Sequence, residues 1–345
     1  MQALDSRKEF ILKTVVEDYI KSVEPVGSQR IVENYGLKVS SATVRNELVY
    51  LEKAGYLLQP HTSAGRIPTD SGYRYYVNEL LKKERNFIFS EEGSICELFS
   101  AGNNELDVLM RETSHLLSRL TKYVAFVFAP SSKVNYLKHI DLILIRPHTV
   151  LIVVIMNTGY VSKKIIDLDY ELSQKCLRNL EILLNERLDN LRPKEIMEIG
   201  QNLIEFSPEV RDVAGRVMRH ILDCFTSEEN EQFFLGGTSN ILLQPEFQNS
   251  KKIQLILEIL EQGDIIANLY KDTSKPGFVS VRIGHENLKD EVDECSLVFG
   301  TYGAKGQSLG ALGVLGPTRL DYFRSISVVE SISKSLSYFL ESLYS

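Results

Sequence analysis

The stretch from Pro25 to Val77 limits most strongly what this chain can fold into. It predicts a short helix from Ser28 to about Tyr35, a turn at Gly36 and a second helix from about Ser41 to Ala54. A small hairpin follows, and its tight loop runs from His61 to Arg66. Two helices joined by a turn and followed by a hairpin are the parts of a winged helix-turn-helix, which lays its second helix in a DNA groove.

The second helix of this stretch has two contrasting sides. At 100° per residue, Val44, Leu48 and Leu51 fall within one narrow arc, which is therefore the buried side. The opposite side carries small, amide and basic groups, the types that read base edges and hold phosphates. A solvated helix face is the alternative, but the neighbouring hairpin favours contact with DNA. The residues expected at the DNA are Ser41, Thr43, Arg45, Asn46, Lys53, His61, Thr62, Ser63 and Arg66.

These candidates differ in the part of the duplex that they suit. Thr43 and Asn46 are expected at base edges, and Arg45 at a base or a phosphate. His61 opens the loop, where a DNA contact and a hydrogen-bonded turn are equally good interpretations. Gly65 is expected to give the tip of the loop its backbone freedom. The side chains expected mainly on phosphates are Lys53, Thr62, Ser63 and Arg66.

The charge of the chain agrees with a DNA contact confined to one small face. The 345 residues carry a net charge of −7, yet residues 1–85 hold 13 Lys and Arg against 11 Asp and Glu. That segment is therefore +2, and the remainder is −9. Because an acidic body repels phosphate, the net charge argues against a protein that coats nucleic acid indiscriminately.

The cysteines and the apolar runs bear on where the protein works. Cys96, Cys176, Cys224 and Cys295 are isolated from one another, and we expect reduced, mostly buried thiols. The N-terminus lacks a long apolar core behind basic residues, and the longest uninterrupted apolar run is Val150–Met156. We therefore expect a soluble cytoplasmic protein with no membrane partner.

Beyond residue 82 the chain changes pattern three times. Residues 82–103 have no periodicity and suit a linker, and an amphipathic helix follows from Asn104. Four β-rich runs then predict an antiparallel meander: Tyr123–Ala129, Tyr136–Ile145, Thr149–Met156 and Tyr160–Leu168. Helical patterns follow at Leu172–Leu191, Lys194–Phe206, Ser207–Phe225 and Ser250–Gln262, then strands at Phe278–Ile283, Leu297–Thr301 and Leu309–Leu315, and a helix at Leu320–Leu343. This order favours one α+β domain with a helical insertion.

A search for catalytic or metal-binding chemistry gives no positive signal. The glycine-rich run from Phe299 to Ser308 lacks the Gly-Lys-Ser/Thr ending of a phosphate loop, so a turn between two strands is the favoured interpretation. The six histidines show no metal-ligand spacing, and no Gly-x-Ser-x-Gly nucleophile motif is present. We expect neither enzymatic activity nor a cofactor.

The run SATVRNELVYLEKAGYLLQPHTSAGRIPTDSGYRYYV resembles the N-terminal signature of the bacterial heat-inducible transcription repressor HrcA family, in which HTSAGR-x-PT is a specific block. Looser similarity continues through KHIDLILIRPHTVLIVVIMNTGYVSKKIIDL and GALGVLGPTRLDY. The resemblance implies an α+β multidomain protein: a winged helix-turn-helix and a GAF-like α+β domain with a helical inserted dimerisation element. The expected division is the DNA-binding domain at 1–81, a linker at 82–103, the GAF-like domain at 104–169 and 249–345, and the inserted element at 170–248.

The resemblance also implies a function and partners. Similar proteins repress chaperone operons by binding an inverted-repeat operator as homodimers, because two readers related by a twofold axis match two half-sites. A GroEL-type chaperonin promotes their active form, and heat diverts it to unfolded chains. Two alternatives stay open at this point. The GAF-like domain could bind a small-molecule effector, or the winged helix could serve only protein contacts.

Overall fold

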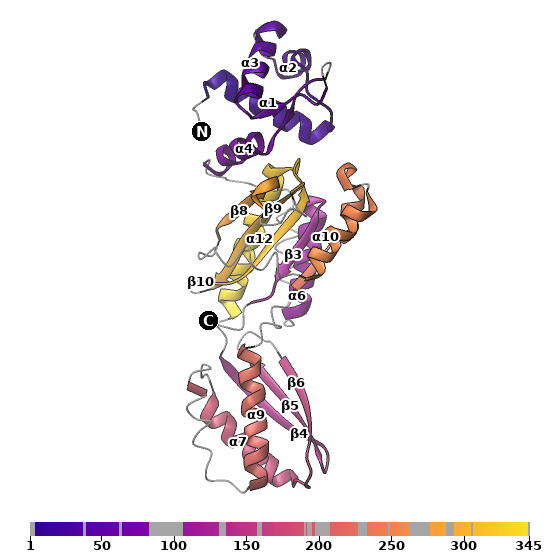
Figure 1. Ribbon diagram of the computed structural model, residues 1–345. Helices are drawn as coiled ribbons and strands as arrows, with labels where there is room; N and C mark the ends of the chain where they lie inside the picture. The colour runs from indigo at the N-terminus through magenta and orange to yellow at the C-terminus, as the bar shows by residue number, and fades with distance from the viewer. Residues whose placement is uncertain are drawn as a thin grey trace.

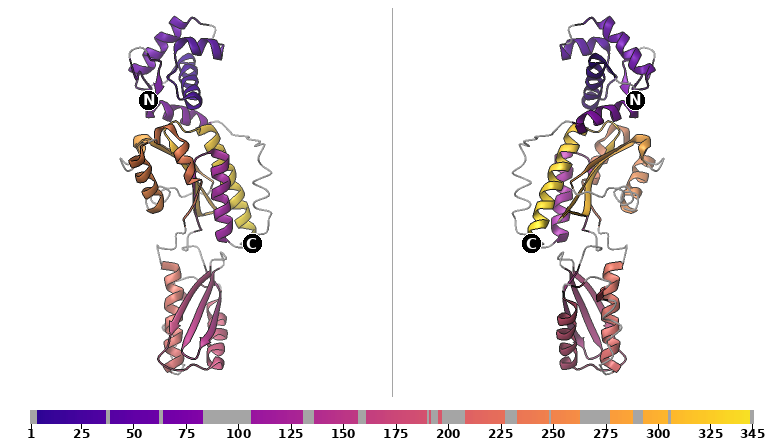
Figure 2. Two further views of the ribbon diagram at one scale, coloured as in Figure 1. Left: turned by 90° about the vertical axis from the view of Figure 1, so that its right-hand side faces the viewer. Right: turned by 90° about the vertical axis from the view of Figure 1, so that its left-hand side faces the viewer.

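The computed structural model describes residues 4–36, 39–61, 64–82, 106–130, 136–156, 161–189, 191, 195–196, 208–226, 233–247, 249–262, 277–287, 293–304 and 306–343. Three bodies lie in a row: an N-terminal module, a central α+β domain and a smaller α+β unit at the far end (Figure 1). The two side views of Figure 2 show the same order. The linker expected at 82–103 lies outside the described residues except for Lys82, which ends a helix.

The N-terminal module consists of helices and one small hairpin. Its elements are α1 (Ser6–Ser22), α2 (Ser28–Tyr35), α3 (Ser41–Lys53), β1 (Leu57–Leu58), β2 (Ile67–Pro68) and α4 (Asp70–Lys82). Gly36 ends α2 in the left-handed region with φ of 62°, which glycine adopts without strain. Val44, Leu48 and Leu51 are buried against α1, as the periodicity predicts. The hairpin strands are antiparallel, so this module is consistent with a winged helix-turn-helix.

The central domain is built on a five-stranded antiparallel sheet. Its strands are β3 (Val124–Phe128), β7 (Phe233–Gly236), β8 (Val279–Ile283), β9 (Cys295–Ala304) and β10 (Gln307–Pro317), in the order β7-β3-β10-β9-β8. Its helices are α6 (Leu106–Thr121), α10 (Ser250–Gln262) and α12 (Tyr322–Leu343), with short 3-10 turns η3 (Thr238–Leu243), η4 (Pro245–Phe247) and η5 (Gly284–Glu286).

Helices cover both faces of this sheet. α6 and α12 lie side by side on one face, and α10 lies on the other (Figure 2). On the α10 side the buried rings of Phe126, Phe128 and Phe247 fill the space between the strands and the helical segments. The arrangement is an α+β domain, consistent with the GAF-like fold that the family resemblance implies.

The far unit interrupts the central domain between two paired strands. Phe128 at the end of β3 pairs with Phe233 at the start of β7, so the chain leaves and returns at the same place on the sheet. The unit holds a second sheet of β4 (Leu137–Arg146), β5 (Thr149–Met156) and β6 (Val161–Asp167), with α7 (Gln174–Leu188) and α9 (Pro208–Thr226). It has a hydrophobic core of its own on the side of these two helices.

This arrangement corrects two sequence predictions. The sequence predicts one four-strand meander at 123–168 and an inserted helical element at 170–248. The structure instead places β3 in the large sheet, and the separate sheet begins at Leu137, so the insertion contains strands as well as helices. An apolar strand pattern shows that a segment pairs but not with which partner, and the partners of β3 lie more than 100 residues away.

Other predictions fall on described residues as well. The glycine-rich run forms the paired ends of β9 and β10, and Gly306 takes φ of 77° in the turn, which confirms a turn between strands. Cys224 and Cys295 are buried thiols while Cys176 is exposed, and burial raises the pKa of Cys295 to about 12. Cys96 and most of the helix predicted at 194–206 lie outside the described residues. In the part of the chain that the structure describes, no helix is both long and apolar enough to cross a membrane.

Candidate nucleic-acid interface

A buried acid holds the helix-turn-helix together. Asp18 of α1 forms an ion pair of 2.6 Å with Nε of Arg30 in α2. Its carboxylate also accepts hydrogen bonds from Nη2 of Arg30 (3.1 Å) and from the hydroxyl of Tyr35 (3.3 Å). Because Asp18 is almost fully buried, its charge needs these partners. The network therefore fixes α2 against α1 and sets the platform on which α3 lies.

The predicted DNA-facing side of α3 is open to solvent. Asn46 and Lys53 are exposed opposite the buried side, and Ser41 and Arg45 are exposed on its flank. Thr43 is only half-buried, and its hydroxyl lies 3.0 Å from that of Ser40, which caps the helix by accepting a hydrogen bond from the Thr43 N–H. The structure therefore brings the predicted helix residues to one surface, with Thr43 at its edge.

Two basic residues from α1 flank this face, and the sequence analysis missed them. Arg7 and Lys8 lie 3.7 Å and 3.4 Å from the carboxylate of Glu47 on α3. Lys8 also stands over the ring of Tyr50, 4.8 Å from its centre. A hydrogen bond to Asp5 raises the pKa of Lys8, which keeps it charged. No local spacing links α1 to α3, so only the folded module reveals this contact.

The hairpin contacts the segment that immediately precedes α2. Val26 and Arg66 form an isolated β-bridge, with both N–H to carbonyl distances at 2.9 Å. A Cβ on Gly65 would lie 2.4 Å from the carbonyl carbon of Val26. Gly65 is therefore required by a close backbone approach, whereas the sequence analysis assigns it backbone freedom at the tip. His61 is exposed, and Thr62 and Ser63 lie outside the described residues.

Arg66 has a structural partner that the sequence analysis did not anticipate. Its Nε and Nη2 atoms lie 3.0 Å and 2.9 Å from Oε2 of Glu52 on α3, and the side chain is 12% exposed. This ion pair ties the base of the hairpin to the second half of α3. Tyr50 on α3 and Leu58 on β1 remain 41% and 40% exposed, so the same surface also offers two apolar contacts.

A helix-turn-helix with a hairpin, attached to a larger α+β body, is the construction of DNA-binding transcription regulators. The family model described as HrcA protein C terminal domain matches residues 107–326. The chain belongs to the HrcA family. Within the described residues no cluster of metal-ligand side chains accompanies the site.

Individual relatives resemble the chain over nearly its whole length. The heat-inducible transcription repressor HrcA of Desulforamulus reducens is 37% identical over 343 residues, which cover 98% of this chain and 97% of that protein. The protein of the same name from Halalkalibacterium halodurans is 37% identical over 354 residues, 99% of each chain. These names denote transcription repressors and not enzymes, in agreement with the sequence analysis.

One solved structure resembles the whole chain. A crystal structure of a hypothetical protein superposes with a TM-score of 0.71 at 25% identity, covering 99% of this chain and 100% of that one. The α+β fold described above therefore recurs in an experimental structure.

Proposed function

We propose that this protein represses heat-shock chaperone operons from the cytoplasm by binding an inverted-repeat operator as a homodimer. The observation that carries the proposal is the exposed surface of α3, which presents Ser41, Arg45, Asn46 and Lys53 to solvent next to a hairpin. The relatives bear the name heat-inducible transcription repressor. None of the observations favours an effector bound in the central domain.

Each predicted residue has a proposed role in the contact with DNA. Thr43 and Asn46 read base edges, Arg45 reaches a base or a phosphate, and Ser41 donates near the start of the helix, where the helix dipole favours an anion. The pair with Glu52 involves two nitrogens of Arg66, so the remaining N–H groups reach a phosphate while the ion pair holds the hairpin. Lys53, His61, Thr62 and Ser63 complete the phosphate contacts.

A homodimer is supported by the insertion. The sheet side that faces away from α7 and α9 carries an aliphatic row across its three strands, in which Ile143 pairs with Leu151 and Leu151 with Ile165. Ile143 and Ile165 are exposed. Because an exposed aliphatic sheet face is costly in water, a second copy of the same face is the occupant that we propose.

The heat response is proposed to work through a partner. A GroEL-type chaperonin promotes the active form, and unfolded chains compete for the chaperonin at high temperature. Repression then weakens when unfolded protein accumulates. The name heat-inducible of the relatives supports this order of events.

The test is a gel shift with duplexes from upstream of the cell's own chaperonin genes, with and without chaperonin. We expect retardation of the inverted repeat and a tighter complex when chaperonin is present. Loss of preference over a scrambled duplex of the same length would contradict operator recognition. An operator complex that is unaffected by chaperonin would contradict only the proposed role of the chaperonin.

The base-reading role of Asn46 has a sharper test. Asn46→Ala should cost about 1–3 kcal/mol of discrimination between operator and scrambled duplex, because a bidentate amide contact to adenine is lost. Gln254→Ala is the matched control, since Gln254 is an exposed amide on α10 and should leave both affinities unchanged. Equal losses on both duplexes for Asn46→Ala would move that residue from base reading to phosphate contact.

A further inference from the structure

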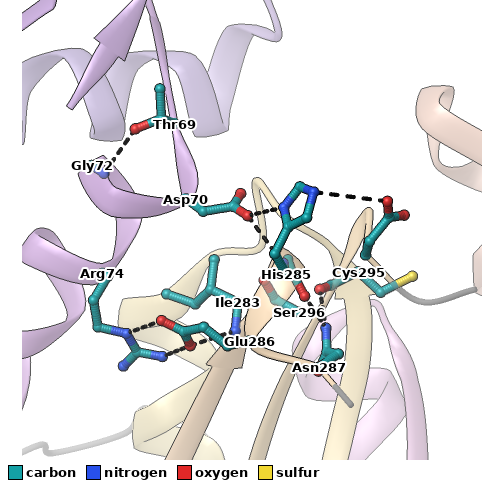
Figure 3. A network of polar contacts seen from close by, with 12 residues as sticks. Thr69, Asp70, Gly72, Arg74, Ile283, His285, Glu286, Asn287, Cys295 and Ser296 are labelled. Atoms are coloured by element: carbon teal, nitrogen blue, oxygen red, sulfur yellow. Dashed lines mark hydrogen bonds and ion pairs between the residues drawn. The ribbon is translucent and has the colours of Figure 1, made fainter. Parts of the chain in front are cut away.

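Two pairs of polar side chains join the N-terminal module to the central domain. Asp70, the first residue of α4, accepts hydrogen bonds from the backbone N–H of His285 (3.1 Å) and interacts with its ring Nδ1 (2.7 Å). One turn later, Nε of Arg74 donates to Oε1 of Glu286 (2.7 Å), and its Nη2 contacts Oε2 of the same carboxylate. We call Asp70, Arg74, His285 and Glu286 the clasp; Figure 3 shows these side chains pointing toward one another across the two bodies.

The central domain is shaped to receive α4. The carboxylate of Glu286 already accepts the N–H of Ile283 (2.9 Å), so it is held in place where it meets Arg74. Nη2 of Arg74 also donates to the carbonyl of Val281 (2.7 Å). Gly284 has φ of 53°, and a Cβ there would lie 2.1 Å from Oδ2 of Asp70. The conformation therefore favours glycine, and a side chain there would displace the Asp70 carboxylate.

Buried aromatic side chains also join the module to the central domain. The rings of Tyr73 and Tyr322 are 5.7 Å apart, and both side chains are buried. Burial raises the pKa of both phenols, so they stay neutral. Apolar packing is non-directional, whereas a bidentate arginine–carboxylate pair imposes a direction. The clasp is therefore the directional part of this contact.

The clasp lies between the module and the rest of the molecule, so the orientation of the module affects where α3 lies in a dimer. The module lies at one end of the row of bodies and the insertion at the other (Figures 1 and 2). If two copies meet through their insertions, any change of angle between the module and the central domain moves α3 relative to the partner's α3. Half-site spacing is a fixed distance on DNA, so both modules must be held at matching angles.

We propose that Asp70, Arg74, His285 and Glu286 are positioning residues for operator recognition, which fix the module on the central domain and thereby set the half-site spacing that the dimer accepts. This inference rests on the proposed function. The clasp touches no base, and its effect appears only when two half-sites are bound together. Its contribution is the effective concentration of the second reader at the second half-site.

The test compares Arg74→Gln and Glu286→Gln with wild type on three kinds of duplex: the inverted repeat, the same repeat with spacers altered by a few base pairs, and a single half-site. We expect each variant to lose about tenfold or more in affinity for the repeat, about twofold or less for the half-site, and to lose its preference for the natural spacer. Lys334→Gln is the control, since it removes an exposed ion pair with Glu330 on α12.

Agreement between the two variants guards against misfolding, because they lie in different bodies and remove the same pair. Equal losses on half-site and repeat would overturn the proposal, and so would an unchanged spacer preference. Tighter operator binding would overturn it as well, since the clasp would then restrain the module in a non-binding orientation.

Failure of the proposed function would look different, because wild type itself would show no preference for the repeat. A measurement without DNA then decides about the clasp. Hydrogen exchange at the His285 amide and along α4 should speed up in both variants while α1 and α3 stay protected. Unchanged exchange would show that these side chains do not hold the module.

Discussion

The two sheets of this protein differ in how their faces are covered. In the central sheet, all ten residues of β9 are buried, because helices pack on both faces. In the insertion, β5 alternates between buried and half-buried positions, because α7 and α9 cover only one face. The central sheet is therefore covered on both faces within one chain, whereas the small sheet leaves an aliphatic face open to solvent.

Glycines in the central sheet show how its cover is achieved. A Cβ on Gly300 would lie 2.6 Å from the hydroxyl of Ser333 on α12, and one on Gly313 would lie 2.6 Å from the ring of Phe126. Missing side chains let α12 and the neighbouring ring approach closely. The open face of the small sheet instead has Leu151, Val153 and Ile155 along β5. These branched side chains are half-buried in the single chain, and we propose that the sheet of a second copy covers them.

The largest effect should come from the closed sheet. Phe126→Ala should lower the free energy of opening of β3 by about 3–5 kcal/mol, because the ring is buried and its removal leaves a cavity. Val153→Ala, on the open face, should lower that of β5 by about 1 kcal/mol or less in the monomer. Native-state hydrogen exchange of β3 and β5 measures both. Comparable losses at the two sites in monomeric protein would show that the open face is already covered within one chain.

The next effect concerns what covers the open face. Ile165→Asp should weaken the dimer by about 2 kcal/mol or more, because a carboxylate would be buried in an apolar contact. Ile165 is 62% exposed in the single chain, so its fold should survive. Sedimentation equilibrium measures the dissociation constant.

Ile182→Asp is the matched control for the dimer contact. Ile182 lies on α7 of the same unit and is 48% exposed, so it tests the same chemical change away from the open face. A dimer weakened by Ile182→Asp and not by Ile165→Asp would place the contact on the helices.

The sequence predicts local features well because their signals are local. The bounds of α2 and the buried side of α3 follow from glycine placement and helical periodicity. Strand partners do not, because both β3 and β4 carry a strand pattern that gives no sign of the sheet to which each belongs. For the same reason, the pattern of α3 predicts the candidate site residues on that helix but not the contribution of Arg7 and Lys8 from α1. The contact between Arg74 and Glu286 is not predictable from local patterns either, because these residues lie 212 positions apart.

The smallest expected effect concerns the covered side of the small sheet. A buried polar side chain lies there, whereas aromatic rings are buried on the α10 side of the central sheet. His220 of α9 is buried, with Nε2 at 3.2 Å from the hydroxyl of Ser162 on β6. Burial lowers the pKa of His220, the charge of Lys164 lowers it further, and Asp223 opposes them. In the folded state this imidazole is therefore neutral at a pH where the unfolded chain already binds a proton.

The sign of the pH dependence follows from that difference. The contribution of neutral His220 is complete above the unfolded pKa of about 6.5 and declines as the pH falls toward the lower folded pKa. Calorimetry of the full chain at pH 7 and pH 5.5 should show a larger drop in unfolding temperature for wild type than for His220→Gln, whose amide keeps a hydrogen bond and does not titrate. His148→Gln, at an exposed histidine of the same unit, should behave like wild type. An equal drop in unfolding temperature for His220→Gln and wild type would show that protonation of His220 does not destabilise the covered face of the small sheet.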